Sequence, residues 1–477
     1  MIYSDYHVLD IRLFDNGNEI SPKSRKWPRL ISSKGAAMAQ ESIKPDGYMP
    51  RIVDQQIERY LRIFGAVEIS GTKWCGKTWS ALMHAQSVSY VDQAKELAKS
   101  DPSIMLLGDK PHVVDEWQLV PPIWDAVRHE VDRTRGTRGA FILTGSSTPL
   151  KSAQDSTEDE NARPSHSGAG RIGRIRMYPM SLAESGESSQ KISLQGLFDG
   201  KFEPCATSKD TLGLVNAACR GGWPEAIDLD TADAQVIARE YLNITFSESI
   251  PRLSLNGDIA RRLLNSIARN LGQATTYKTI IADMYGEEEN PAALADEAKV
   301  AAYIAALRGM YIVEEVPGWA PPARSRKRFS TKPKRYLADP SLAVATLGMS
   351  AEALLQDWQT FGLVFENLCI RDLSVYARSL DLLDNNAIRY YRDDSGLEAD
   401  AIVLLADGRW AAFEFKVGED KVAAGVSSLS RLRAKLLKNP KAQVKPPAFM
   451  AVITGNGEYA REVEGGIYSI PLRVLGK

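Results

Sequence analysis

Apolar and polar residues follow helical and extended spacing in turn along the first half of the chain. Apolar side chains then recur at helical spacing, which predicts a helix that ends at Gly65, and they are Ile52, Ile57, Tyr60, Leu61 and Phe64. Between there and residue 145 we predict strands at 66–70, 87–91, 111–115 and 140–144, with helices at 77–86, 92–99 and 121–134. Strands that alternate with helices favour a parallel α/β sheet.

The spacing changes twice more towards the C-terminus. Predicted helices at 258–271, 277–284 and 292–309 are followed by a short strand at 310–314. Three helices and an extended element resemble a winged helix-turn-helix, although a helical lid without a ligand would give the same pattern. From residue 355 we predict a last α/β unit, with helices at 357–379 and 420–437 and strands at 387–391, 398–405 and 409–415.

Two segments lack any periodicity. Residues 1–47 mix charges with Pro, Ser and Gly and are expected to form a poorly ordered tail, and the polar segment 151–170 is expected to be a mobile loop. The chain therefore divides into a tail at 1–47, an α/β domain at 48–228, a helical, winged-helix-like region at 229–340 and a second α/β domain at 341–477.

Composition narrows the class of protein. A chain of 477 residues, 44% of them hydrophobic, is too long for one ordinary core, so several domains are expected. The four cysteines, Cys75, Cys205, Cys219 and Cys369, form no CxxC pair, which argues against a zinc ribbon or a disulfide framework and favours the reducing cytoplasm. No apolar run approaches the roughly 20 residues that span a bilayer, so no membrane contact is expected.

Basic and acidic residues nearly balance, at 59 and 60, so any contact with nucleic acid must come from a local patch. A basic cluster occupies the position of a wing, and its members are Arg324, Arg326, Lys327, Arg328, Lys332, Lys334 and Arg335. The cluster could bind the phosphate backbone of DNA or RNA. A solvated loop explains the same composition, so both interpretations stay open at this stage.

One short motif, which we call the glycine loop, carries the strongest chemical signal. Its spacing is G-x-x-x-x-G-K-[ST], and it joins the strand at 66–70 to the helix at 77–86. The residues expected to bind nucleotide are Gly71, Thr72, Lys73, Trp74, Cys75, Gly76, Lys77 and Thr78. Backbone N–H groups of such a loop surround phosphates at a helix N-terminus. We predict bound ATP, with Lys77 at its β- and γ-phosphates and Thr78 as a ligand of Mg²⁺.

Two carboxylates end the strand predicted at 111–115. Asp115 fits the residue that holds Mg²⁺ through water, and Glu116 fits the general base that polarises the attacking water. The alternative is that adjacent acids at a strand end cap the following helix.

Further candidates follow the next strand. Thr144 or Ser146 could orient water or sense the γ-phosphate, although either hydroxyl could equally satisfy local backbone groups. After the polar segment, Arg171 is the first candidate to stabilise transition-state charge, at its own site or at a neighbour's.

The order of these motifs resembles the bacterial and archaeal AAA-type ATPases of the P-loop class that carry a C-terminal domain of uncharacterised role. The matching segments are Gly71–Thr78, Val113–Gln118, Leu143–Ser147, Gly170-Arg171, Tyr178–Glu184 and Gly221–Pro224, within residues 50–440. The resemblance implies an ATP-binding core followed by a helical region and a nuclease-like end.

Four charged residues of the last α/β unit could form a second site. Strand alternation places Glu414 and Lys416 on one face, with Asp400 on the adjacent strand and Glu366 on a helix. Asp400 and Glu414 could bind Mg²⁺ while Lys416 positions a water or stabilises a pentavalent phosphate, with help from Glu366.

This arrangement resembles the PD-(D/E)xK nuclease superfamily, and the supporting segments are Gly362–Asn367, Tyr390–Arg392 and Leu397–Asp400. The resemblance implies a restriction-endonuclease-like α/β fold and metal-dependent phosphodiester cleavage. A retained fold that pairs Glu with Lys and has no activity is the alternative.

The main functional hypothesis is an Mg²⁺-dependent ATPase whose nucleotide state controls a nuclease-like or DNA-binding C-terminal half. The alternative is a nucleotide-gated DNA-binding regulator with an inactive nuclease-like fold. A kinase or other nucleotide transferase is less favoured, because Asp115 and Glu116 suit water activation better than deprotonation of an acceptor. Association into a homo-oligomer is a further expectation.

Overall fold

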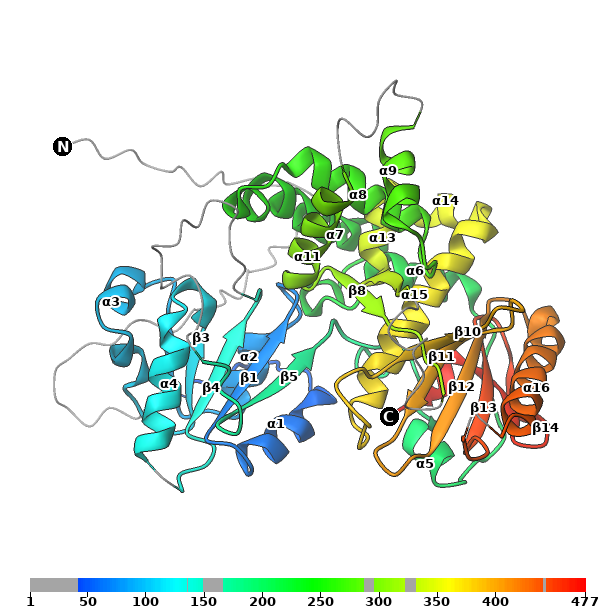
Figure 1. Cartoon of the computed structure of the whole chain (residues 1–477), viewed down its shortest axis with the longest axis horizontal. Helices are drawn as coiled ribbons and strands as arrows, with labels where there is room; N and C mark the ends of the chain where they lie inside the picture. Colours follow the sequence, from blue (N-terminus) through cyan, green and yellow to red (C-terminus); the bar gives the residue numbers. More distant parts are fainter. Residues whose placement is uncertain (1–41, 135, 149–165, 287–295, 322–331, 441–442) are drawn as a thin grey trace, which may run out of the picture. The chain divides into compact units, whose positions relative to one another are not determined.

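The first sheet of the protein is parallel throughout, as the alternating pattern predicts (Figure 1). The computed structural model describes residues 42–134, 136–148, 166–286, 296–321, 332–440 and 443–477. In the order β2-β3-β4-β1-β5, the strands are β2 (Ser87–Tyr90), β3 (His112–Asp115), β4 (Phe141–Gly145), β1 (Ala66–Gly71) and β5 (Ile172–Met177). The helices are α1 (Val53–Leu61), α2 (Lys77–Met83), α3 (Lys95–Ser100) and α4 (Pro122–Arg133).

Apolar burial explains why this sheet forms. β1, β3 and β4 are buried along nearly their whole length, as expected for parallel strands covered on both faces. Trp124 of α4 belongs to the same buried cluster as Val114 and Leu143. The structure confirms the strands predicted at 66–70, 111–115 and 140–144, whereas β5 lies outside the predicted elements.

A mostly helical region follows the first sheet. Its helices are α6 (Thr211–Arg220), α7 (Thr231–Ile244), α8 (Gly257–Arg269), α9 (Tyr277–Tyr285), α11 (Glu297–Gly309), α13 (Pro340–Thr346) and α14 (Ala351–Gln356). Short polar side chains cap their first turns, as Asn256 does for α8 and Thr276 for α9. An antiparallel hairpin of β8 (Val313–Val316) and β9 (Lys334–Leu337) comes after α11, so three helices and a hairpin occur in the predicted order.

A second, mixed sheet lies in the C-terminal part of the chain (Figure 1). In the order β10-β11-β12-β13-β15-β14-β7, its strands are β10 (Arg389–Arg392), β11 (Glu398–Leu404), β12 (Trp410–Lys416), β13 (Phe449–Thr454), β15 (Ile467–Pro471), β14 (Tyr459–Glu464) and β7 (Cys205–Ala206). Two long helices, α15 (Trp358–Ala377) and α16 (Val422–Lys438), pack on it.

Alternate side chains of this sheet pack into two different hydrophobic cores, one on each face. Ile402 and Ala412 pack in the cluster that contains Leu429 of α16, whereas their neighbours Ala401 and Phe413 pack in the cluster that contains α15. Both faces are therefore covered, which explains why its central strands are almost wholly apolar.

The segment that follows the first sheet also contributes to the second. It contains β6 (Ile192–Ser193), α5 (Leu194–Phe198) and β7, and β7 pairs with β14 while β6 pairs with β16 (Leu475–Gly476). The chain thus crosses to the C-terminal sheet before it enters the helical region. Residues Lys44–Lys477 form one compact unit.

A buried ionic network joins three distant parts of the chain. The guanidinium of Arg371 on α15 contacts Asp339 at 3.0 Å and Asp372 at 2.7 Å. Asp339 accepts a hydrogen bond from the backbone N–H of Gly222, and Asp372 accepts one from the N–H of Leu182. All three charged side chains are almost fully buried, and the pairing compensates for their desolvation.

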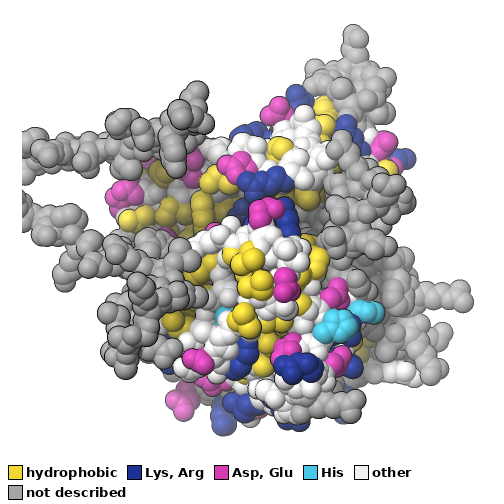
Figure 2. Space-filling model, turned by 90° about the vertical axis from the view of Figure 1, so that its left-hand side faces the viewer, with side chains coloured by type: hydrophobic (Ala, Val, Ile, Leu, Met, Phe, Trp, Pro, Cys, Tyr) yellow, Lys and Arg dark blue, Asp and Glu magenta, His cyan; other side chains and the backbone are white. Residues whose placement is uncertain are grey.

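The surface carries charges of both signs. Figure 2 shows one face on which apolar side chains gather between basic and acidic ones, so no field of a single sign dominates that face. Among the helices that the structure describes, none is long and apolar enough to cross a membrane. Residues 1–41 of the predicted tail and residues 149–165 of the predicted loop lie outside the described residues.

Candidate functional site

The glycine loop connects β1 to α2 and needs glycine at two positions. A Cβ atom at Gly71 would lie 2.4 Å from the carbonyl oxygen of Met177, so the neighbouring strand leaves no room for a side chain. Gly76 has φ of 97°, a left-handed conformation that glycine adopts without strain. This turn starts α2 at Lys77, which directs the free N–H groups of its first turn towards the loop.

The bulky residue of the loop packs on the helical region. The ring of Trp74 lies edge-on against Tyr241 of α7, with ring centroids 5.5 Å apart. Tyr241 in turn stacks on Trp223 at 5.3 Å. Trp74 nevertheless remains 43% exposed, so the loop keeps an accessible aromatic surface.

Two side chains at the start of α2 contact the glycine loop and the end of β3. The buried Lys77 donates from Nζ to the carbonyl oxygen of Thr72 at 2.7 Å, and the hydroxyl of Thr78 donates to Oδ1 of Asp115 at 2.8 Å. The hydroxyl of Thr72 is buried and has no hydrogen-bond partner within the described residues. An unpaired polar atom inside a glycine loop fits a site for a polar ligand.

The ends of β3 and β4 bring four more polar side chains together. Thr144 donates from its hydroxyl to Oδ1 of Asp115 and also accepts from the N–H of Glu116. Glu116 has φ of 57° and accepts a hydrogen bond from Ser146 at 2.7 Å and one from Gln118. The turn after β3 therefore places Asp115 beside Thr78 and gives Glu116 fixed hydrogen-bond partners.

Burial raises the pKa of Asp115, while hydrogen bonds from Thr144 and Thr78 oppose that rise. A desolvated carboxylate beside a threonine hydroxyl has the oxygen donors that Mg²⁺ prefers. Thr78 and Asp115 thus fit a site for this cation, and the glycine loop fits the phosphates that the cation would neutralise.

The structure corrects the role expected of Arg171 at its own site. Residue 171 precedes β5, whose parallel register pairs Ile172 with Ala66 and Met177 with Gly71. Arg171 is therefore at the opposite end of the sheet from the glycine loop, at about 20 Å for six extended residues. Its guanidinium pairs with Asp132 at 2.9 Å. Action on a neighbour's site stays a prediction.

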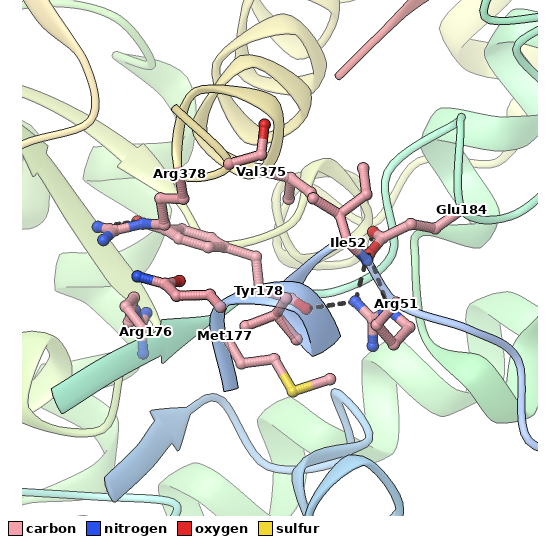
Figure 3. A pocket seen from close by; sticks show the side chains of 11 residues that line it. Arg51, Ile52, Arg176, Met177, Tyr178, Glu184, Val375 and Arg378 are labelled. Carbon is pink, nitrogen blue, oxygen red and sulfur yellow. Dashed lines mark hydrogen bonds and ion pairs between the residues drawn. The ribbon is translucent and has the colours of Figure 1, made fainter. Parts of the chain in front are cut away.

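A different arginine supports the loop, and no sequence motif marks it. Arg51 donates to the carbonyl oxygen of Cys75 at 2.8 Å and to that of Tyr178 at 2.9 Å, and it pairs with Glu184 at 3.1 Å (Figure 3). Both side chains of the pair are 3% exposed. Glu184 also accepts from the N–H of Ile52, so the pair fixes the start of α1 against the loop.

A second cluster contains the residues predicted for the C-terminal site. Lys416 pairs with Oε2 of Glu414 at 2.7 Å, as expected for alternate residues on one face of a strand. Asp400 accepts a hydrogen bond from the backbone N–H of Phe415, which joins β11 to β12. Glu366 reaches the cluster from α15 and accepts from the hydroxyl of Tyr336 at 2.6 Å.

An open cleft of about 480 Å³ lies beside this cluster. The segment between α8 and α9 forms one wall, which includes Gly272 and Thr276. Acidic and basic side chains line the opposite side, and they are Glu366, Glu398, Asp400, Lys334 and Arg392. Within the described part of the chain, no group of three or more His, Cys, Asp and Glu side chains is arranged to hold a metal ion.

The structure also corrects two members of the basic cluster. Lys334 and Arg335 are each 4% exposed and cannot present their charges to a nucleic-acid backbone. Arg335 pairs with Glu315 at 3.1 Å. Lys332 is exposed, whereas Arg324, Arg326, Lys327 and Arg328 lie outside the described residues.

Stability should depend on pH through this second cluster. Burial, followed by the charge of Asp400, raises the pKa of Glu366 and of Glu414 to about 7 from the usual 4.5. Between these values the folded protein binds more protons than the unfolded chain, so the free energy of unfolding should fall as pH rises towards 7. The free energy of unfolding, measured with denaturant, should be about 2 kcal/mol lower at neutral pH than at acidic pH. A Glu414→Gln variant with the same pH dependence would contradict this assignment.

Comparison with known protein families divides the chain into three matched segments. Residues 64–186 match an AAA domain, residues 212–353 match a domain of unknown function (DUF8612), and residues 361–475 match another (DUF4143). The first match supports a P-loop ATPase domain around the glycine loop.

Comparison with solved structures gives distant likenesses. The Walker-type ATPase PABY2304 of Pyrococcus abyssi is 14% identical with a TM-score of 0.41, over 65% of this chain and 98% of that one. The replication initiator DnaA bound to AMPPCP and single-stranded DNA is 13% identical with a TM-score of 0.20, over 54% and 86%. No curated protein matches the chain.

Proposed function

We propose that this protein binds ATP with Mg²⁺ at the glycine loop and hydrolyses it. The observation that carries this proposal is the convergence of Thr78, Asp115 and Glu116 at the ends of adjacent elements. The match of residues 64–186 to an AAA domain supports it.

Each residue has a role that follows from its position. The N–H groups at the start of α2 and Lys77 bind the phosphates, and Thr78 and Asp115 hold Mg²⁺. Glu116 accepts the proton of the attacking water, while Ser146 and Gln118 orient its carboxylate. Bound Mg²⁺ would supply positive charge against the phosphate oxygens.

Replacement of Lys77 by Ala should weaken ATP binding. Loss of a charge-assisted hydrogen bond to phosphate removes about 1.5–3 kcal/mol, which corresponds to an affinity lower by about 10- to 150-fold. Calorimetric titration with ATP and Mg²⁺ measures this change, and the rate of phosphate release should fall with it.

Lys99→Ala provides the matched control, because among the described residues Lys99 makes only an exposed pair with Glu96 on α3. It should leave both affinity and turnover unchanged. Equal ATP turnover by the wild-type protein and Lys77→Ala would refute the ATPase proposal.

We further propose that the nucleotide state controls the C-terminal half. Arg176 contacts Glu314 of β8, so the first sheet and the hairpin share a direct ion pair. Arg176 precedes Met177, the residue of β5 that pairs with Gly71. A conformational change at the glycine loop would thus reach the hairpin through this ion pair.

The C-terminal half has two candidate activities, cleavage of nucleic acid and binding of DNA without cleavage. Mg²⁺-dependent cleavage of DNA or RNA that disappears in Asp400→Ala would assign a nuclease. DNA binding that weakens with salt and occurs without cleavage would assign a regulator. The buried ammonium of Lys334 among the carboxylates favours the regulator.

A further inference from the structure

The acidic cluster of the C-terminal half already contains a cation supplied by the chain. Nζ of Lys334 lies 2.6 Å from Oε1 of Glu398, 3.4 Å from Oε1 of Glu366 and 3.6 Å from Oδ1 of Asp400. The side chain is only 5% exposed. One ammonium therefore faces three carboxylates, two from β11 and one from α15.

The hairpin fixes this lysine in position. Lys334 begins β9 and pairs with Val316 of β8, so its backbone belongs to a ladder. Two residues further along the same strand face, the hydroxyl of Tyr336 donates to the same oxygen of Glu366. The amide of Asn367 on α15 bonds both to the N–H and to the carbonyl of Leu337, at 2.9 and 2.8 Å.

Other carboxylate oxygens of the cluster also accept hydrogen bonds from the protein. Oδ2 of Asp400 accepts from the N–H of Phe415, and Glu414 is paired with Lys416 and accepts from Ser428. Mg²⁺ requires several oxygen atoms at about 2.0–2.1 Å in octahedral geometry. Carboxylates that surround an ammonium and bond to backbone do not offer such a set, so these residues do not fit the divalent cation that the nuclease resemblance implies.

We propose that Lys334 is a built-in counter-ion that takes the place of a divalent metal ion in the C-terminal acidic cluster and excludes the metal from it. Charge supports this conclusion, because removal of Lys334 would leave the carboxylates of Glu366 and Asp400 without the ammonium that now faces them, and among the described residues Glu398 would keep only Arg392 at 4.0 Å. The β8–β9 hairpin thus supplies the cation of the cluster, while the cleft beside the cluster stays open. This inference does not depend on ATP hydrolysis.

Mn²⁺ titration of the full-length protein without nucleotide tests the proposal, with electron paramagnetic resonance to count the free ion. The wild-type protein should show no Mn²⁺ binding that depends on Asp400. The Asp400→Asn variant should therefore give the same Mn²⁺ titration curve as the wild type. Lys334→Met should bind Mn²⁺ at least tenfold more tightly, a gain of about 1.4 kcal/mol. The double variant with Asp400→Asn should lose that gain.

Two results would overturn the proposal. One is Mn²⁺ binding by the wild-type protein that Asp400→Asn abolishes, and the other is a folded Lys334→Met protein whose Mn²⁺ affinity equals that of the wild type. The comparison of wild type with Asp400→Asn can still overturn the proposal if Lys334→Met fails to fold.

Amine acetylation read by mass spectrometry gives a second measurement on the unaltered chain. The exposed Lys332 should react and Lys334 should stay protected, with or without millimolar Mn²⁺. Acetylation of Lys334 that increases when Mn²⁺ is added, while that of Lys332 stays constant, would mean that metal displaces the ammonium and would contradict the proposal.

Discussion

Replacement of Glu116 by Gln should lower the rate of ATP hydrolysis by about 10²–10⁴-fold and leave ATP binding nearly unchanged. The amide cannot accept a proton from the attacking water, but its oxygen can still accept the hydrogen bonds that Ser146 and Gln118 donate. Its shape preserves the turn after β3, where residue 116 has φ of 57°. Steady-state phosphate release and calorimetric ATP titration on the same sample separate the two effects.

The matched control for this change is Glu96→Gln, which alters an exposed carboxylate on α3. It should leave both turnover and affinity as they are in the wild-type protein. Wild-type turnover in Glu116→Gln would exclude Glu116 as the base. A loss of affinity equal to the loss of turnover would instead assign Glu116 to nucleotide binding.

Replacement of Arg51 by Met should reduce the free energy of unfolding by about 3–5 kcal/mol, because it leaves Glu184 charged, buried and unpaired. The carbonyl groups of Cys75 and Tyr178 lose a donor in the same step. Since Cys75 belongs to the glycine loop, ATP affinity should fall as well. Denaturant unfolding measures the first effect and calorimetry the second.

An exposed pair offers a control for Arg51. Arg59 lies 3.8 Å from Asp381 with side chains 58% and 79% exposed, so Arg59→Met should change stability by less than about 1 kcal/mol. The double variant Arg51→Met/Glu184→Gln should be more stable than Arg51→Met alone, because the buried charge is gone. Equal losses from Arg51→Met and Arg59→Met would show that the buried pair has no special role.

Sequence patterns were informative where the structure is local. The glycine loop needs only one strand, one turn and one helix, all within 66–83, so spacing and glycine content predict it. The same holds for Asp115 and Glu116, which end a buried strand. Thr78 reaches Asp115 because α2 follows β1 and β3 ends at the same edge of the parallel sheet, with β4 between the two strands.

Residues that act through distant partners were not predictable in this way. Arg51 and Glu184 are 133 positions apart, and a single arginine before a helix resembles any surface residue. The position of Arg171 relative to the glycine loop depends on β5, a strand that the periodicity does not predict. With β5 at Ile172–Met177, residue 171 lies at the end of the sheet opposite the glycine loop of its own chain.

The C-terminal cluster shows the same limit. Strand alternation correctly joined Glu414 to Lys416, which are two residues apart. Lys334 was assigned to a basic loop, because its carboxylate partners on α15 and β11 lie 32 to 66 positions further along the chain. Only the packed hairpin shows that this lysine points inward rather than to solvent.

The buried network around Arg371 has a consequence for synthesis of the chain on the ribosome. The N–H groups of Leu182 and Gly222 find their acceptors on Asp372 and Asp339, which are made 190 and 117 residues later. A nascent chain that has released the first sheet but not α15 would leave these groups without their native partners. We therefore expect the N-terminal half to complete its native hydrogen bonds only after translation has passed residue 372.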